Sequence, residues 1–459
     1  MTRTSRFAGF FLVAVLASPA AAEAPRTDPG KAADPVIAWT VEGFASGVGG
    51  MIHRDAAFGF DLGIGAQVAA FRGLLAAPVR FDRKGLRRAD WDERTDFGRI
   101  VSELAWQGPG DPWWLRLAPV EGLTLGTGNL VSDFVSTIDP DHWRTGFVGA
   151  LDFRPVAAQV FLDSFLDPQV LGGRVAIRPF YWVDDQGIFG RLEVGMALAG
   201  DLRMPWDPRP GPPDATGIPA SGREGLLAGS IDLRWTLWRS RTVEVTPHGA
   251  WTRLGVSDAA HAGLTLALAP HQNVRLRLGG EWRWLGPRAV LPWFDGLYMA
   301  DRHVFLDQPK GRARDLASDG RHGSAVHFGL EWRPWLDLGG EFHHDPRWDF
   351  ATVSASLAVQ WPDHLRIAAT LRARGLGHPR RGPDRLLAAV SADATLWKSI
   401  ALFGVYARDL AGCTAPDGSG SLCPSDSFLL GLRLALCHEA PATKPREDLK
   451  STQTGQDRR

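Results

Sequence analysis

The sequence lacks long apolar runs. Beyond its N-terminal region, polar or charged residues interrupt every apolar stretch of the 459-residue chain before it reaches about 18 residues. A helix needs roughly 20 predominantly apolar residues to cross a bilayer. No transmembrane helix is therefore expected.

The sequence also lacks an excess of charge of either sign. It carries 51 basic and 51 acidic residues, so its formal net charge is zero. Proteins that bind nucleic acid usually carry clustered or excess basic residues that neutralise phosphates. The composition therefore gives no indication of a nucleic-acid partner, and no motif indicates a cofactor.

Cysteine and tyrosine are scarce, with three residues of each. Cys413 and Cys423 fall in one connection rich in glycine, proline and serine, and Cys437 ends the last apolar segment. In an exported protein such a loop predicts a disulfide between Cys413 and Cys423. The cysteine spacing matches no metal-binding pattern, so no metal site is expected.

The N-terminus has the pattern of a secretory signal peptide. Arg3 and Arg6 precede the apolar stretch Ala8–Ala17, and the small residues Ala20–Ala22 follow it. This order predicts export with cleavage after Ala22, whereas a buried N-terminal helix is the less favoured alternative. Residues 23–56 are interpreted as either a flexible segment or a first strand, and residues 438–459 as a polar, disordered tail in the periplasm.

Alternating apolar and charged residues are abundant. In Asn273–Leu285, Val274, Leu278 and Trp282 share one parity, and charged residues occupy the other. Successive side chains of a strand point to opposite faces, so the pattern predicts a strand with one apolar and one charged face. The apolar face would point into the core of a soluble sandwich or into the lipid around a membrane barrel.

The connections between such segments distinguish these two folds. Tight turns such as 239–240, 270–272 and 362–364 alternate with longer connections such as 201–224, 255–261, 286–322 and 410–426. Outer-membrane barrels have short periplasmic turns and long extracellular loops. The sequence therefore predicts an all-β, closed, up-and-down antiparallel transmembrane barrel over residues 57–437. It should have about 18 strands within a range of 16 to 20, because segments 36–45 and 79–81 could each add a strand. A soluble periplasmic protein is the main alternative.

In this pattern the chain, from Ala57 to Cys437, resembles bacterial outer-membrane β-barrels of porin type; the resemblance rests on strand pattern and not on a family motif. It implies a location in the outer membrane, contact with membrane lipid, and passive diffusion of small hydrophilic solutes or ions, and it is compatible with a homo-oligomer. The alternative function is a structural or partner-binding barrel that acts through its long loops.

If the apolar parity faces lipid, the charged parity lines the lumen. Charged rings in a channel select solutes by field and diameter, although the same charges could instead pair across strands and stabilise the wall. The predicted pore-lining residues are Arg191, Glu193, Asp232, Arg234, Arg275, Arg277, Glu281, Arg283, Glu331, Arg333, Arg366, Arg372 and Asp393.

Two segments break the strand pattern. Residues 78–97 concentrate charge and could fold into the lumen as a constriction loop, but a solvated extracellular loop is the favoured interpretation. Residues 122–142 are rich in glycine and then acidic. Capped turns are favoured there over a calcium site at Asp139, Asp141 and His142, since the oxygen ligands are too few. This segment could also pack inside the barrel.

A catalytic function has little support in the sequence. An acyl hydrolase would need a serine and a histidine oriented by a third group, and His322-Gly323-Ser324 and Gly377-His378 are the nearest candidates. Neither matches a nucleophile motif, so no catalytic residue is assigned. His343 and His344 are adjacent and should point to opposite faces of a strand.

Overall fold

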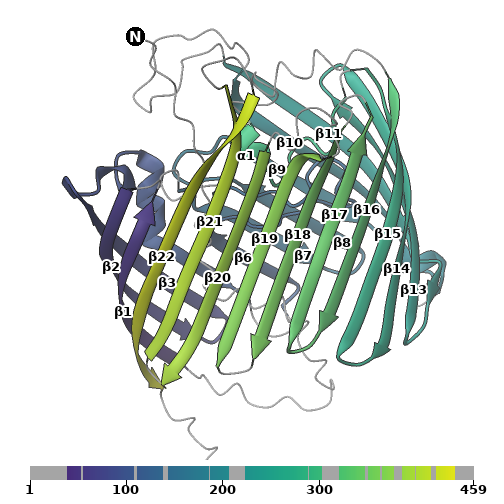
Figure 1. Ribbon diagram of the computed structural model, residues 1–459. Helices are drawn as coiled ribbons and strands as arrows, with labels where there is room; N and C mark the ends of the chain where they lie inside the picture. Colours follow the sequence, from purple (N-terminus) through teal and green to yellow (C-terminus); the bar gives the residue numbers. More distant parts are fainter. Residues whose placement is uncertain are drawn as a thin grey trace, which may run out of the picture.

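The computed structural model describes residues 39–52, 55–107, 111–137, 143–185, 187–205, 223–287, 289–301, 320–346, 350–361, 364–376, 385–397, 400–414 and 420–439. The described chain forms one closed, antiparallel β-barrel of 20 strands (Figure 1). Each strand pairs with the next one along the chain, and β1 pairs with β22 to close the wall. The predicted fold class is therefore confirmed.

The wall strands are β1 (Trp39–Ile52), β2 (Asp55–Val68), β3 (Phe71–Asp82), β5 (Val101–Trp106), β6 (Trp113–Ala118), β7 (Gly146–Asp152), β8 (Val156–Leu162), β9 (Val170–Ile177), β10 (Leu192–Pro205), β11 (Arg223–Trp235), β13 (Val243–Leu254), β14 (Ser257–His271), β15 (Val274–Leu285), β16 (Arg321–Trp332), β17 (Leu336–Asp345), β18 (Phe350–Trp361), β19 (Leu365–Leu376), β20 (Arg385–Trp397), β21 (Ile400–Thr414) and β22 (Gly420–Glu439). Two strands of two residues each, β4 (Gly85–Leu86) and β12 (Trp238–Arg239), pair with β3 and β13.

The described helices are short. They are η1 (Arg88–Asp90), η2 (Arg94–Ile100), η3 (Phe189–Arg191) and α1 (Tyr298–Asp301). None of the helices in the described ranges is long and apolar enough to cross a membrane.

The strand count lies at the upper end of the predicted range because the N-terminal part is more regular than its sequence suggests. The two segments expected as additional strands, 36–45 and 79–81, fall largely in β1 and within β3. β1 also lies inside the segment 23–56, so the described wall begins at Trp39 and not at Ala57. Residues 1–22 of the expected signal peptide and residues 440–459 of the expected tail lie outside the described residues.

Two expected long connections are in fact short. Residues 255–261 do not form a loop, because β13 and β14 are joined by a tight turn at Gly255 and Val256. Gly255 has φ +61°, a conformation that glycine adopts without steric cost. β21 and β22 extend into the expected connection 410–426, which places Cys413 and Cys423 on strands.

The strand register gives the wall one inner and one outer face. Across four neighbouring strands the pairs His248↔Gly263, Gly263↔Glu281 and Glu281↔Ala325 form one row. Paired residues point to the same face, and side chains alternate along each strand. Glu281 is buried inside the barrel. Its partners on the neighbouring strands, and every second residue from them, therefore also face inward.

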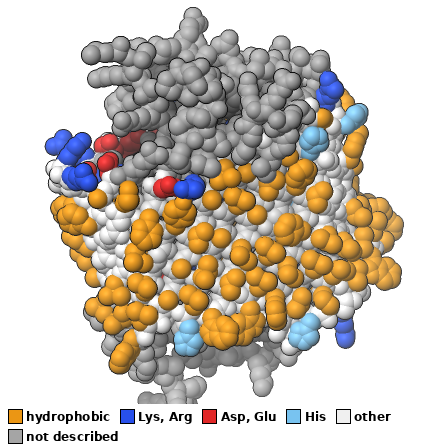
Figure 2. All heavy atoms as spheres, in the orientation of Figure 1, with side chains coloured by type: hydrophobic (Ala, Val, Ile, Leu, Met, Phe, Trp, Pro, Cys, Tyr) orange, Lys and Arg blue, Asp and Glu red, His pale blue; other side chains and the backbone are white. Residues whose placement is uncertain are grey.

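The outer face is apolar. Leu227, Ile64 and Trp282 are 68%, 56% and 53% exposed although each lies within a regular wall strand. Figure 2 shows hydrophobic side chains over the visible wall, with charged side chains gathered near its edges. Monomeric soluble proteins rarely expose contiguous apolar surfaces of this extent, whereas the lipid-facing band of a membrane barrel has this composition.

Candidate functional site: the interior of the barrel

The segment 120–137, here called the crossing segment, lies inside the barrel and touches opposite walls. Near its start, a Cβ atom on Gly126 would lie 2.6 Å from Nε of Arg174 on β9. Farther along, Asp133 accepts hydrogen bonds of 2.8 and 3.0 Å from Arg372 on β19. From β9 to β19 the wall runs through β10, β11 and β13 to β18, which is nine pairings out of 20. The crossing segment therefore spans the lumen.

Two further polar contacts hold the crossing segment to wall strands between β9 and β19. The Asn129 side-chain amide donates to the Thr252 hydroxyl on β13. The Ser132 hydroxyl donates to Glu341 on β17 at 3.1 Å. Packing inside the barrel is one of the alternatives expected for residues 122–142, and it is found for residues 122–137. Asp139, Asp141 and His142 lie outside the described residues.

A second inner segment, residues 286–301, packs on the crossing segment. The backbone N–H of Ser132 donates to the Phe294 carbonyl at 3.0 Å, and the Phe294 N–H donates to the Leu130 carbonyl at 3.1 Å. The Tyr298 hydroxyl donates to the Asp201 carboxylate on β10 at 2.8 Å. These bonds satisfy backbone and side-chain groups that lie away from bulk water.

The two inner segments share an apolar core with one side of the wall. Phe134, Trp293, Phe294 and Tyr298 are fully buried. The same cluster includes residues of β8 to β13, namely Phe161, Val170, Ala199, Met204, Leu226, Ala228 and Leu254. The interior next to these strands is therefore filled by protein.

The charged segment 78–97 is packed in part: Arg80, Arg87, Asp90 and Asp96 are buried, whereas Arg83, Lys84, Arg88, Asp92 and Arg94 are exposed. The Asp90 carboxylate is fully buried and accepts hydrogen bonds from Arg80, Arg87 and Arg99 at 3.1, 2.8 and 3.1 Å. Asp96 accepts from the Glu93 backbone N–H at 2.9 Å and closes a capping box at the start of η2. Our favoured interpretation of a solvated loop is wrong for these residues, because the opposite charges stabilise each other in a buried network.

Burial also changes the protonation of this segment. Loss of contact with water raises the pKa of Asp96 to about 6, although Arg99 and the Glu93 N–H act in the opposite direction. Glu121, at the start of the crossing segment, is exposed to the inside of the barrel, but desolvation by the surrounding protein still raises its pKa against the opposing effect of Arg116, Arg372 and Arg366.

A cavity of about 140 Å³ lies on the opposite side of the interior from the apolar core. Residues of β1 to β3, β5 and β19 to β22 line it together with Arg99 of η2 and Trp143. Its charged residues are four arginines, Arg80, Arg99, Arg366 and Arg433, and two aspartates, Asp61 and Asp393. Phe44 and Phe403 also line it, and the Arg433 guanidinium lies 5.9 and 5.1 Å from their ring centres. The lining thus combines basic and aromatic groups.

The barrel is apolar outside, charged inside and closed by the pairing of β1 with β22. This is the architecture of a porin-type outer-membrane β-barrel. No protein-family model matches it, and no curated protein does. Among solved structures it is similar to a mutant of the ferric enterobactin receptor PfeA of Pseudomonas aeruginosa (TM-score 0.38, 11% identity, 86% of this chain and 80% of that chain). It is also similar to OccK5 (OpdH) of Pseudomonas aeruginosa (TM-score 0.34, 8% identity, 87% and 98%). A third is OccAB2 of Acinetobacter baumannii (TM-score 0.33, 8% identity, 87% and 98%). At these values the similarities assign no function, and the fold rests on the strand pairing described above.

The structure separates the predicted pore-lining residues into groups. Arg366 and Asp393 line the cavity. Arg191 lies in η3 and Arg333 in the turn after β16, so neither is on a wall strand. The remaining predicted residues occupy inner positions of wall strands. They are Glu193, Asp232, Arg234, Arg275, Arg277, Glu281, Arg283, Glu331 and Arg372.

Many of these charges form ion pairs. Arg174 on β9 contacts Glu193 and Asp232, both at 2.9 Å. Glu331 lies 3.4 Å from Arg277 and 3.1 Å from Arg333. A large share of the inner charges therefore pair across strands and stabilise the wall, which is the expected alternative to charges that select solutes.

Sequence reasoning missed several residues of the cavity. Asp61 and Arg433 occupy inner positions of β2 and β22, opposite Ser46 of β1, and the alternation of those strands could have indicated them. Arg99 could not be found in this way, because its position depends on how η2 packs on Asp90 and Asp96.

The histidines considered for other functions lie apart. His322 stacks on Trp282 at 5.0 Å on the outer face, next to Ser324 two residues farther along the same face. His343 points inward to Glu341 at 3.0 Å while the adjacent His344 points outward. Residues 377 and 378 lie outside the described residues. One further group on the inner wall, His248, His261 and Glu281, could hold a metal ion.

Cys413 and Cys423 have side chains outside the described residues. The register pairs Cys413 with Ser421 and Cys423 with Ala411, so the two cysteines are diagonal neighbours on β21 and β22. The disulfide between them stays a prediction.

Proposed function

We propose that this protein is an outer-membrane channel of porin type for the passive diffusion of small hydrophilic solutes, with a preference for anions. The observation that supports it best is the cavity with four arginines and two aspartates inside a barrel whose outer face is apolar. A lumen with an excess of one charge attracts solutes of the opposite charge.

Arg366 is the residue on which the anion preference depends most. Arg80 and Arg99 are partly neutralised by Asp90, and Arg433 lies 3.6 Å from Asp393. Within the described ranges, no carboxylate lies within the 4.0 Å ion-pair distance of Arg366. Asp393 lies opposite Arg366 in the register and Glu121 interacts with it electrostatically, but neither is within ion-pair distance, so the charge of Arg366 is the least neutralised of the four.

The crossing segment and the second inner segment would narrow this path. They fill the lumen beside β8 to β13 and leave the arginine-lined side next to β1–β3 and β19–β22. A small solute would therefore pass along the arginine-lined wall, with the Asp133–Arg372 contact at the edge of its path.

Planar bilayers test the proposal directly. The purified protein should insert with stepwise conductance, and a salt gradient should give a reversal potential of the sign expected for anions. Membrane fractionation and heat-modifiable gel migration test the outer-membrane location. A persistently silent bilayer would contradict the open channel and favour the alternative, a structural or partner-binding barrel that acts through its long loops.

A further inference from the structure

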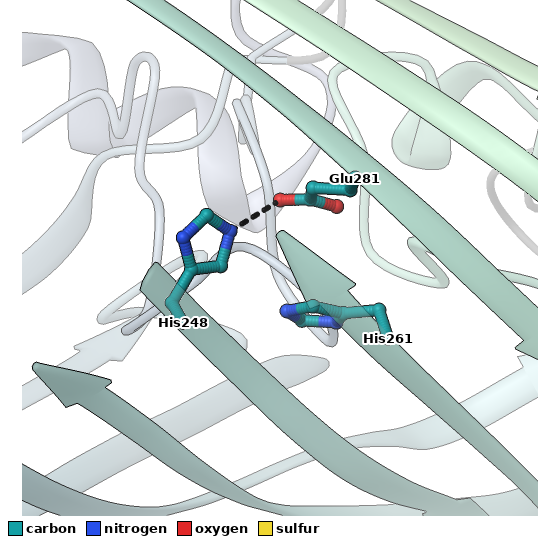
Figure 3. A group of neighbouring side chains, drawn as sticks. All are labelled: His248, His261 and Glu281. Carbon is teal, nitrogen blue, oxygen red and sulfur yellow. Dashed lines mark hydrogen bonds and ion pairs between the residues drawn. The ribbon is translucent and has the colours of Figure 1, made fainter. Parts of the chain in front are cut away.

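Three titratable side chains meet on the inner wall at the middle of three successive strands. His248 lies on β13, His261 on β14 and Glu281 on β15, and Figure 3 shows all three pointing into the same space. One potential ligand atom from each residue lies within 4.8 Å of the others. His248 Nε2 and Glu281 Oε1 are 3.3 Å apart.

Gly263 makes this meeting geometrically feasible. It lies between His248 and Glu281 in the same row of paired residues. A Cβ atom on Gly263 would lie 2.6 Å from His248 Nε2 and 2.9 Å from Glu281 Cγ. The absence of a side chain on β14 therefore allows residues of two non-adjacent strands to approach each other.

His261 has no hydrogen-bond partner in the described structure. The residue is 4% exposed, and both ring nitrogens are buried without a partner. Its ring centre lies 5.7 Å from that of His248, with the planes at 70°. Buried polar side chains are nearly always satisfied, so an unsatisfied imidazole beside a second histidine and a carboxylate calls for a partner.

Arg283 orients the carboxylate of Glu281. Its Nη2 and Nε donate to Glu281 Oε2 at 2.7 and 3.1 Å. Its Nη1 in turn lies 3.0 Å from His343 Nδ1 and donates to the Leu291 carbonyl at 3.4 Å. Oε2 is thus occupied, and Oε1 lies 3.3 Å from His248 Nε2. Hydrogen bonds of this kind commonly fix the orientation of a metal-binding carboxylate.

We propose that His248, His261 and Glu281 form a binding site for a divalent transition-metal ion of the Zn²⁺ type. Two imidazoles and one carboxylate are a ligand set that zinc uses with a fourth position left for water. Zinc–ligand bonds of about 2.0 Å place tetrahedral ligand atoms about 3.3 Å apart, which is the separation of His248 Nε2 and Glu281 Oε1. Ca²⁺ fits poorly, since it takes six to eight oxygen ligands.

A bound ion would connect parts of the interior that strand pairing does not. It would join β13 to β15 directly and, through Glu281 and Arg283, would fix the second inner segment at Leu291. This inference does not depend on solute passage, because the ion would be held in the wall.

Titration of the full-length protein with ZnCl₂ tests the site. The protein is folded in detergent, freed of any affinity tag and treated with a chelator. Calorimetry should find one zinc ion per chain, and Co²⁺ in its place should give the visible absorption of a four- or five-coordinate site. His261→Ala removes a ring without hydrogen-bond partners, so the barrel should still assemble. It should weaken zinc binding at least about tenfold.

Two further variants make the outcome decisive. Gly263→Ala should also weaken zinc binding, because its methyl group would occupy the space between His248 and Glu281, while every ligand remains. His344→Ala, which removes an outward-facing histidine, should bind zinc like the wild type. Heat-modifiable migration verifies folding in each case. No saturable zinc binding, or equal affinity in the wild type, His261→Ala and Gly263→Ala, would overturn the proposal.

Discussion

Arg372 on β19 donates two hydrogen bonds to the Asp133 carboxylate of the crossing segment, at 2.8 and 3.0 Å. The two residues are 239 positions apart in the sequence. This pair holds one side of the crossing segment, and another part of the segment, at Gly126, lies against Arg174 on the far wall. If solutes pass through the barrel as proposed, the width of their path should depend on whether the Asp133–Arg372 contact is intact.

Asp133→Asn should loosen the crossing segment. It removes a charge-assisted pair of hydrogen bonds, which typically contribute about 1.5–3 kcal/mol. We expect larger and noisier single-channel conductance in planar bilayers. Asp426→Asn is the control, because it breaks a similar pair with Arg408 that is far more exposed. Equal conductance in Asp133→Asn and the wild type would show that this contact does not limit the conducting path.

Arg366→Glu should shift the ion selectivity towards cations. The substitution reverses a charge in the cavity lining that has no carboxylate within ion-pair distance in the described chain. The measurement is the reversal potential in a salt gradient. Arg253→Glu makes the same change of charge at an outer position of β13 and should leave the reversal potential unchanged.

Charge reversal at Arg275 and Arg277 of β15 tests the wall closer to the short turns. We expect a shift towards cations there as well. The effect of Arg277 should be the smaller one, since Arg277 pairs with Glu331 at 3.4 Å. A reversal potential that does not change in either variant would remove these two residues from the conducting path.

Phe134→Ala should destabilise the inner core without opening the wall. Phe134 is fully buried and packs on Phe161 and Tyr298, with ring centres 5.4 and 6.5 Å away. Truncation of a buried phenylalanine typically costs about 3–5 kcal/mol. Protease cleavage within residues 120–137 should increase while heat-modifiable migration persists. Phe60→Ala, on the outer face, should not increase this cleavage.

The packing of η2 should weaken as the pH rises from about 4 to about 6. Burial raises the pKa of Asp96 from 3.8 to about 6, so the folded segment retains a proton that the unfolded chain has lost. Hydrogen exchange of residues 88–100 should accelerate across this range and level off above it. Asp96→Asn should flatten this dependence, whereas Asp92→Asn, an exposed residue of the same segment, should preserve it.

The expected disulfide can be tested by peptide mapping without reduction. A cross-linked peptide containing Cys413 and Cys423 would confirm the prediction. Because the two cysteines are diagonal neighbours in the register and not directly opposite, the bond requires both side chains to lean along their strands. Two free thiols in the exported protein would contradict it.

Local alternation predicted the wall correctly because the direction of a side chain on a strand depends only on its parity. In β15 the apolar residues Leu278, Trp282 and Trp284 are exposed on the outer face, and Glu281 and Arg283 are buried inside. The same signal failed in residues 255–261, where polar composition suggested a loop and Gly255 instead makes a tight turn. Composition indicates exposure to water, but the length of a connection depends on its backbone conformation.

The interior could not be predicted in this way. Glu281 and Arg283 face inward as the alternation requires, yet they pair with each other and are covered instead of facing an open, watery lumen. Asp90 illustrates the same limit, because a run of opposite charges has the same sequence whether it is solvated or buried. Its burial depends on contacts with Arg80, Arg87 and Arg99 that the run itself does not specify.

By itself the sequence determined that this chain forms a barrel wall with an apolar outer face and a charged inner face, since period-two alternation is a local property of strands. The tertiary structure decided what the inner face contacts. The crossing segment at Asp133 and Arg372, and the meeting of His248, Gly263 and Glu281, depend on register and on contacts between residues far apart in the chain. Such contacts are selected by the packing of the whole barrel, and no short stretch of sequence specifies them.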